Sequence, residues 1–151
     1  MKQIITLFIF LFVFAGCDSD ESETTDLAFS VVLQGDHFNG DYDNKKQNLV
    51  IKDQTTWSNL ISKMNPFPDT NYYFPDDVID FEKYQVIAVF DQIRNYGGYS
   101  IDITKITENN NRILVTVGQL KPGGINPVIT QPYHIVKIPK SNKKVVFQQN
   151  E

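Results

Sequence analysis

The sequence predicts an α+β fold, mostly an antiparallel β-sheet of the meander type with one amphipathic helix packed on it. Three observations lead to this fold class. Apolar residues recur in short strand-like runs, short polar turns separate most of the later runs, and only one segment has helical spacing. Helices and strands do not alternate regularly, which disfavours a parallel, Rossmann-like sheet.

The expected strands follow from these apolar runs. The run from Gln85 to Phe90 is almost continuously apolar, which predicts a strand covered on both faces. After Tyr99 the apolar alternation slips phase at Ile106, as a β-bulge would cause. In chain order the expected strands are 28–33, 48–52, 85–90, 99–107, 112–120, 133–138 and 144–147.

The single helix is expected between the second and third of these strands. Apolar residues at i, i+3, i+4 and i+7, beginning with Trp57 and ending with Met64, form one stripe that would face a core. Thr55 is placed to cap its start, and Asn65-Pro66 would end it. The proline-rich stretch that follows, Pro66 to Phe81, is expected to be an irregular crossover.

Length and composition limit the classes of protein that are compatible. The 151 residues are 41% hydrophobic and 13% aromatic, which fits one folded domain and argues against wholesale disorder. The formal net charge of -4, from 14 basic and 18 acidic side chains, argues against a nucleic-acid partner. One cysteine excludes an internal disulfide and any multi-cysteine metal site.

The N-terminus reads as a lipoprotein signal peptide, residues 1–16. Lys2 precedes an apolar run from Ile4 to Ala15, which is shorter than the about 20 residues needed to cross a bilayer. The run ends in Phe14-Ala15-Gly16-Cys17, where small residues precede the cysteine as in bacterial lipoproteins. We therefore expect Cys17 to be the lipidated first residue of the mature chain, anchored in the membrane through its acyl chains.

An acidic segment follows the cysteine. Residues 17–26 contain no apolar side chain after Cys17 and several carboxylates, so we expect the lipidated cysteine and a flexible tether before a single domain at 27–149. The segment resembles the export signal of surface lipoproteins in Bacteroidetes-type bacteria, although a plain polar spacer would look the same. The expected location is the cell envelope, as an outer-membrane lipoprotein that is exposed at the surface if this signal operates.

No catalytic motif stands out. The sequence has no Gly-x-Ser-x-Gly, no phosphate-binding glycine loop and no His-Glu-x-x-His. His134 alternates with Val136 and Ile138, which favours a buried structural histidine over a general base, and His37 lies in a polar loop. We expect no catalytic residue, cofactor or metal. Asp36 to Asn44 is rich in oxygen ligands but lacks EF-hand spacing, which favours an ordinary turn over a calcium site.

Two loops are the candidate contact surface. The first, Asn95 to Tyr99, has a glycine pair between tyrosines, and the second, Lys121 to Tyr133, is longer than a hairpin requires. Long loops on a rigid sheet often carry binding residues. Val128 and Ile129 would be an apolar anchor if exposed and a loop plug if buried. The candidate partner-binding residues are Tyr96, Gly97, Gly98, Tyr99, Pro122, Gly123, Gly124, Pro127, Pro132 and Tyr133.

The same loops carry a family resemblance. Gly97-Gly98-Tyr99-Ser100-Ile101, then the strand from Arg112 to Val117, then Thr130 to Lys140, are similar to the PrcB family. The Trp57 helix and Asp80-Phe81 before an apolar strand also fit that pattern. The family takes its name from a lipoprotein subunit of a bacterial protease complex. The resemblance implies a non-catalytic protein that stabilises or helps to mature a protease at the cell envelope.

The leading hypothesis is therefore a lipid-anchored accessory protein whose partner is an envelope protein, with a protease as the candidate. A surface lipoprotein that binds a glycan or another small ligand through Tyr72, Tyr73, Tyr96 and Tyr99 is the alternative from another class. An uncharacterised hydrolase ranks last, since it would need His134 paired with a carboxylate in an open cleft.

Overall fold

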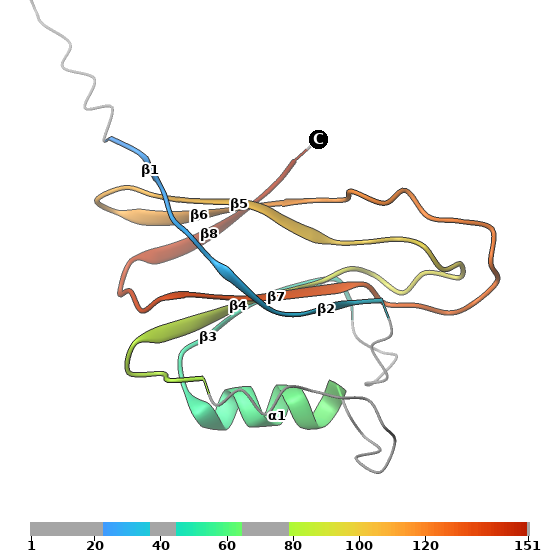
Figure 1. Cartoon of the computed structure of the whole chain (residues 1–151), viewed down its shortest axis with the longest axis horizontal. Coiled ribbons are helices and arrows are strands. Elements are labelled where there is room, and N and C mark those ends of the chain that lie inside the picture. Colours follow the sequence, from blue (N-terminus) through green and yellow to red (C-terminus); the bar gives the residue numbers. More distant parts are fainter. Residues whose placement is uncertain (1–22, 37–44, 65–78, 151) are drawn as a thin grey trace, which may run out of the picture.

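The computed structural model describes residues 23–36, 45–64 and 79–150. The strands in these residues form two four-stranded sheets (Figure 1). Sheet A has the order β1-β5-β6-β8, and sheet B has the order β2-β7-β4-β3. The bounds are β1 (Thr25–Asp26), β2 (Ser30–Gly35), β3 (Gln47–Ile51), α1 (Gln54–Met64), β4 (Tyr84–Phe90), β5 (Asp102–Glu108), β6 (Arg112–Gly118), β7 (Tyr133–Pro139) and β8 (Lys144–Gln149).

The predicted fold class, one mostly antiparallel meander sheet with a helix packed on it, is wrong. The chain builds a β-rich fold of two stacked sheets, and α1 packs on sheet B alone (Figure 1). Within sheet A, β6 and β8 run parallel. The physical reason is the amount of apolar surface: an 11-residue helix covers one face of one sheet, and the apolar residues of β5 and β6 need a second layer.

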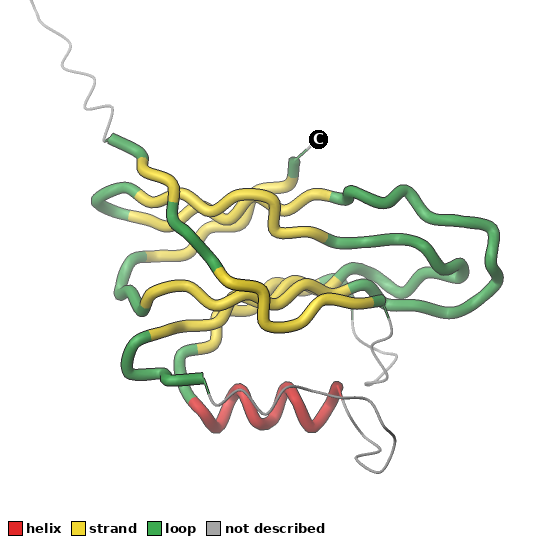
Figure 2. Tube along the Cα trace, in the orientation of Figure 1, coloured by secondary structure: helices red, strands yellow, loops and turns green. Residues whose placement is uncertain are grey.

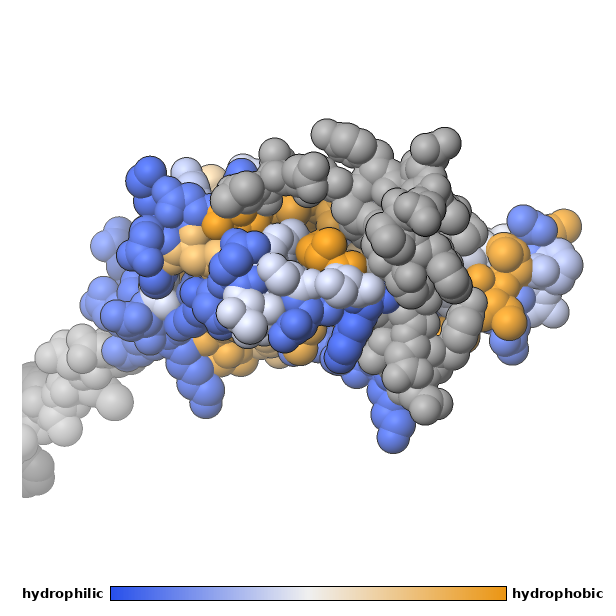
Figure 3. All heavy atoms as spheres, turned by 90° about the horizontal axis from the view of Figure 1, so that it is seen from below, coloured by the Kyte–Doolittle hydropathy of each residue, from blue (hydrophilic) through white to orange (hydrophobic). Residues whose placement is uncertain are grey.

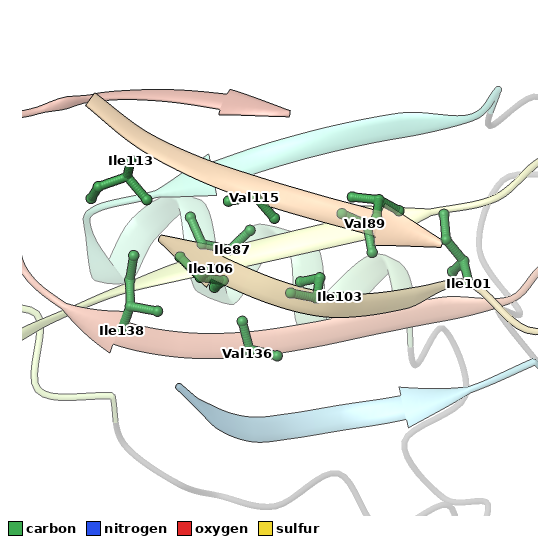
Figure 4. Close-up of a cluster of buried hydrophobic side chains, with 10 residues drawn as sticks. Ile87, Val89, Ile101, Ile103, Ile106, Ile113, Val115, Val136 and Ile138 are labelled. Atoms are coloured by element: carbon green, nitrogen blue, oxygen red, sulfur yellow. The ribbon is translucent and has the colours of Figure 1, made fainter. Parts of the chain in front are cut away.

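The third expected strand shows how the layers are built. β4 is covered on both faces, as predicted, and six of its seven residues are buried. Val86, Ala88 and Phe90 pack in the core beneath α1. Ile87 and Val89, which point the other way because side chains alternate along a strand, pack in the core between the sheets (Figure 4).

The helix is capped two residues earlier than expected. The Asp53 carboxylate accepts a hydrogen bond from the Thr56 amide (2.8 Å) and one from the Thr56 hydroxyl (2.8 Å), so Asp53 and not Thr55 is the N-cap. The Thr56 backbone and side-chain hydrogen bonds lower the pKa of Asp53. The predicted stop at Asn65-Pro66 and most of the expected crossover lie outside the described residues.

The strand ends differ modestly from the expected ranges. Thr25 and Asp26 form β1, pairing with Glu108 and Thr107, although these residues were expected in the tether. The expected phase slip in β5 is confirmed as a register shift between Ile103 and Lys105. β2 begins at Ser30 and not Ala28, because the preceding residues carry the chain from sheet A to sheet B.

Candidate functional site

Two loops lie together at one end of the molecule. Residues 91–101 connect β4 in sheet B to β5 in sheet A, and residues 119–132 connect β6 in sheet A back to β7 in sheet B. Both connections therefore cross between the sheets at the same end, where Figure 2 shows them extending beyond the strands. We call these two segments the paired loops.

Backbone hydrogen bonds join the paired loops along their length. The Arg94 amide donates to the Thr130 carbonyl (2.8 Å) and the Thr130 amide donates to the Arg94 carbonyl (2.9 Å). Further out, the Gly97 amide donates to the Asn126 carbonyl (3.0 Å), and the Gly124 amide donates to the Gly97 carbonyl (2.9 Å). The loops are thus held to each other as an irregular extension of the sheets, which lowers the conformational freedom lost on binding.

Glycine is required where the loops approach most closely. Gly98 has a φ of 83°, and a Cβ there would lie 3.1 Å from the Gly124 nitrogen. Gly123 has a φ of 98°, and a Cβ there would lie 2.3 Å from Cζ of Tyr99. The Tyr99 ring therefore packs directly on the Gly123 backbone, and both glycines are needed for backbone conformation and for space.

A buried ion pair supports the same ring. The Asp91 carboxylate accepts hydrogen bonds from Nη2 (2.7 Å) and Nε (2.9 Å) of Arg94, and its side chain is only 7% exposed. The Arg94 guanidinium lies over the Tyr99 ring, with 4.6 Å between Cζ and the ring centroid. Because the Arg94 backbone is also bridged to Thr130, this one residue links the ion pair, the ring and the second loop.

A second polar cluster fixes the bases of the loops. The Asp102 carboxylate accepts hydrogen bonds from the Ser100 hydroxyl, the Leu120 amide (3.0 Å) and the Gln34 side-chain amide (2.9 Å). The Ser100 oxygen in turn accepts one from the Lys121 amide (2.9 Å). Asp102 is buried, so these partners satisfy a carboxylate that has left water. The end of one loop and the start of the other are tied to this group.

Apolar side chains are exposed on this framework. Six large hydrophobic residues of the described part of the chain are exposed, and four of them lie in the paired loops. Figure 3 shows apolar side chains at this end of the molecule. The four are Tyr96 (48% exposed), Leu120 (71%), Ile125 (95%) and Ile129 (59%). Clustered exposed apolar side chains on a stable surface are typical of protein-binding sites.

The structure brings most of the predicted contact residues together but exposes only some of them. Tyr96, Gly98, Pro122, Gly124 and Pro127 are exposed. Gly97 and Pro132 are buried, and Tyr99 and Gly123 are half-buried against each other. Tyr133 belongs to β7, where its ring packs near Phe90 with 6.3 Å between centroids, in the core beneath α1.

Sequence reasoning missed the most exposed residues. Ile129 is exposed, as the anchor interpretation expected, while Val128 is half-buried against Gly97. Ile125 and Leu120 were not singled out, nor was the Asp91–Arg94 pair. The available signal for Ile125 was its position in Gly123-Gly124-Ile125-Asn126-Pro127, where a large apolar residue stands among turn formers.

His134 has the buried, structural environment that its alternation predicted. It is 5% exposed, and its Nδ1 accepts a hydrogen bond from the Ile103 amide (3.0 Å). Burial lowers the pKa of His134, and the charge of nearby Asp102 opposes this only in part. Since Ser100 donates to Asp102 and not to His134, the three residues are not arranged as a Ser-His-Asp triad.

Several predicted features lie outside the described residues: the signal peptide, Cys17, Tyr72, Tyr73, His37 and the Asp36 to Asn44 loop after its first residue. Among the residues that the structure describes, no three His, Cys, Asp or Glu side chains are grouped so that they could hold a metal ion. In the same part of the chain, no helix has the length and hydropathy needed to cross a membrane.

In the comparison with known proteins, one family model matches the part of the chain that contains this site. The family model described as PrcB C-terminal matches residues 85–139, which confirms the predicted resemblance. The matched segment runs from β4 to the end of β7 and contains both paired loops completely. Neither the comparison with curated proteins nor the comparison with solved structures found a match.

Proposed function

Because residues 85–139 match the PrcB C-terminal family, we propose that this protein is a non-catalytic accessory subunit of an envelope protease complex. It binds and stabilises the protease, or another envelope protein complex, through the paired loops. It is held at the outer membrane by a lipid on Cys17. The acidic segment after Cys17 leaves the folded domain free to reach its partner.

The observation that carries this proposal is the combination of a rigid framework and exposed apolar side chains. Ile125 and Ile129 lie on backbone that is bonded across both loops, so their burial against a partner orders little additional chain. Burying one such side chain contributes about 1.5–3 kcal/mol. Tyr96, which is 48% exposed in the first loop, adds the type of residue that often dominates binding energy at interfaces.

Replacing Ile125 and Ile129 together by serine is expected to weaken partner binding by about 3 kcal/mol, or more than 100-fold. The measurement is crosslinking of the full chain in its own cells, followed by affinity purification and quantification of recovered proteases. Val31→Ser is the matched control, since Val31 is 54% exposed but lies on β2.

Equal recovery of the protease by the double variant would contradict the assignment of the paired loops. Recovery of no envelope protein by the unaltered chain would contradict the accessory function itself. Binding to a glycan array that disappears with Tyr96→Ala would favour the glycan-binding alternative.

Cys17→Ser is expected to abolish incorporation of labelled palmitate and to move the protein out of the membrane fraction. The reason is that the acyl chains on this cysteine are the proposed anchor. Ser19→Ala in the same segment is the control, which should leave labelling and fractionation unchanged. Undiminished membrane association of an unlabelled Cys17→Ser protein would show that another feature anchors the chain.

A further inference from the structure

A groove lies at the β3 edge of sheet B, which is the edge opposite β2. It runs between β3, which is the last strand in the order β2-β7-β4-β3, and helix α1. Its cavity has a volume of about 220 Å³. The lining residues are Gln47, Leu49, Ile51, Thr56, Asn59, Leu60 and Lys63.

In the part of the chain that the structure describes, the strand beside the groove is an edge strand of its sheet. Among the described residues β3 pairs with β4 only, so in this part of the chain the outer edge of Gln47–Ile51 has no strand partner. Natural proteins usually protect such edges, and an unprotected edge beside a groove is the geometry used to bind an extended peptide as an added strand. α1 stands next to this edge and supplies the other wall.

The size of the cavity favours a peptide side chain over a small-molecule ligand. Ligand pockets are typically about 300–1,000 Å³, and this cavity is smaller. Leu49, Ile51 and Leu60 supply apolar walls, which suit an apolar side chain entering from a strand bound along β3. A bound strand alternates its side chains, so every second residue would face the groove.

The charge around the groove selects an acidic segment. Among the described residues that line it there is no carboxylate, and Lys63 lies in the last turn of α1. Because α1 runs back along β3, Lys63 lies at the same end of the groove as Gln47. Lys45 and Lys46 directly precede Gln47 in the chain, so they add positive charge at this end. Lys46 donates to the neutral Gln149 side chain (3.1 Å), so that contact leaves its charge unbalanced. This basic end contrasts with the net charge of -4 of the whole chain.

We propose that the groove binds an extended acidic segment of a partner protein, added as a strand to β3. One apolar side chain of the segment enters the cavity, and a carboxylate two residues away, on the same face of the bound strand, pairs with Lys63. The inference is independent of the paired loops, which lie at an end of the sheets and are not part of this groove.

The test uses a synthetic fluorescein-labelled peptide of two Thr-Leu-Thr-Glu repeats, in which Leu and Glu share one face of the extended strand. Binding to the purified, detergent-solubilised full chain is followed by fluorescence anisotropy. Saturable binding is expected, and Lys63→Glu is expected to weaken it about ten-fold. Asn59→Trp should abolish binding, because the indole would fill the groove from an exposed position of α1. Lys144→Glu on β8 is the control and should bind like the unaltered chain.

Three further peptides separate strand addition from charge attraction. The same peptide with Lys in place of Glu should not bind. N-methylation of the amides on one edge of the Glu-containing peptide should prevent binding, while methylation on the other edge should not. The proposal is overturned if no saturable binding occurs, if both methylated peptides bind equally, or if Asn59→Trp and Lys63→Glu bind as well as the unaltered chain. Far-ultraviolet circular dichroism verifies that each variant is folded.

Discussion

Asp102→Ala is expected to lower the free energy of unfolding by about 3 kcal/mol, because it removes the acceptor for three donors in a partly buried cluster. The Leu120 amide and the Ser100 hydroxyl lose their partner at the bases of the paired loops. Denaturant unfolding measures the loss. Hydrogen exchange at the Leu120 and Lys121 amides should also become faster, since Lys121 donates to the Ser100 oxygen held by this carboxylate.

Asp102→Asn is the matched control. The amide has the same shape, its oxygen can still accept from Leu120 and Ser100, and Gln34 can rotate its own amide to accept from the new NH₂ group. We expect a loss of about 1 kcal/mol or less for this variant. Equal losses for the two variants would mean that the charge, and not the set of hydrogen bonds, is what stabilises the cluster.

Much of the local structure could be predicted because local sequence patterns determine it. The Trp57 to Met64 stripe gave the helix, and the unbroken apolar run after Gln85 correctly predicted a strand with two covered faces. The N-cap was missed because Asp53 and Thr55 are both good capping residues. Which of them accepts the first amide depends on the path by which β3 enters the helix.

The layering could not be predicted in the same way. Periodicity shows that a face of a strand is apolar but not which element covers it. The apolar faces of β5 and β6 were therefore compatible with a one-sheet fold and with a two-sheet fold alike. The parallel pairing of β6 with β8 is a long-range contact that joins Ile113 to Val145 in register, with no turn signal in the sequence. The crossing of both long connections at one end follows from this layering.

The site was predicted in outline for a related reason. Glycines and prolines marked both loops, and Gly98 and Gly123 adopt the positive φ that such residues permit. The sequence could not show that the loops bond to each other, and that contact decides which side chains face solvent. The contact between the loops buries Pro132 and Gly97, holds the Tyr99 ring on Gly123, and leaves the Ile125 side chain almost completely exposed.

Gly123→Ala is expected to lower the free energy of unfolding by about 2–4 kcal/mol, or to unfold the paired loops locally. Two costs combine. A φ of 98° costs a residue with a Cβ about 1–3 kcal/mol, and the new methyl group would lie 2.3–2.6 Å from three atoms of the Tyr99 ring. Denaturant unfolding and hydrogen exchange at Gly97 and Thr130 report the global and local effects. Gly124→Ala is the control, because the nearest atom to its Cβ is the Gly97 oxygen at an ordinary 3.5 Å.

A double-mutant cycle with Tyr99→Ala separates the two costs of the alanine at position 123. Without the ring, the methyl group has space, and only the backbone strain remains, so Gly123→Ala should cost less in the Tyr99→Ala background than in the unaltered chain. An unchanged cost would assign the whole effect to the backbone and none to the ring. The same variant tests the site. The Tyr99 ring holds the two loops together through Arg94 and Gly123. Tyr99→Ala should therefore weaken the binding of a partner by Ile125 and Ile129, although Tyr99 itself does not contact the partner.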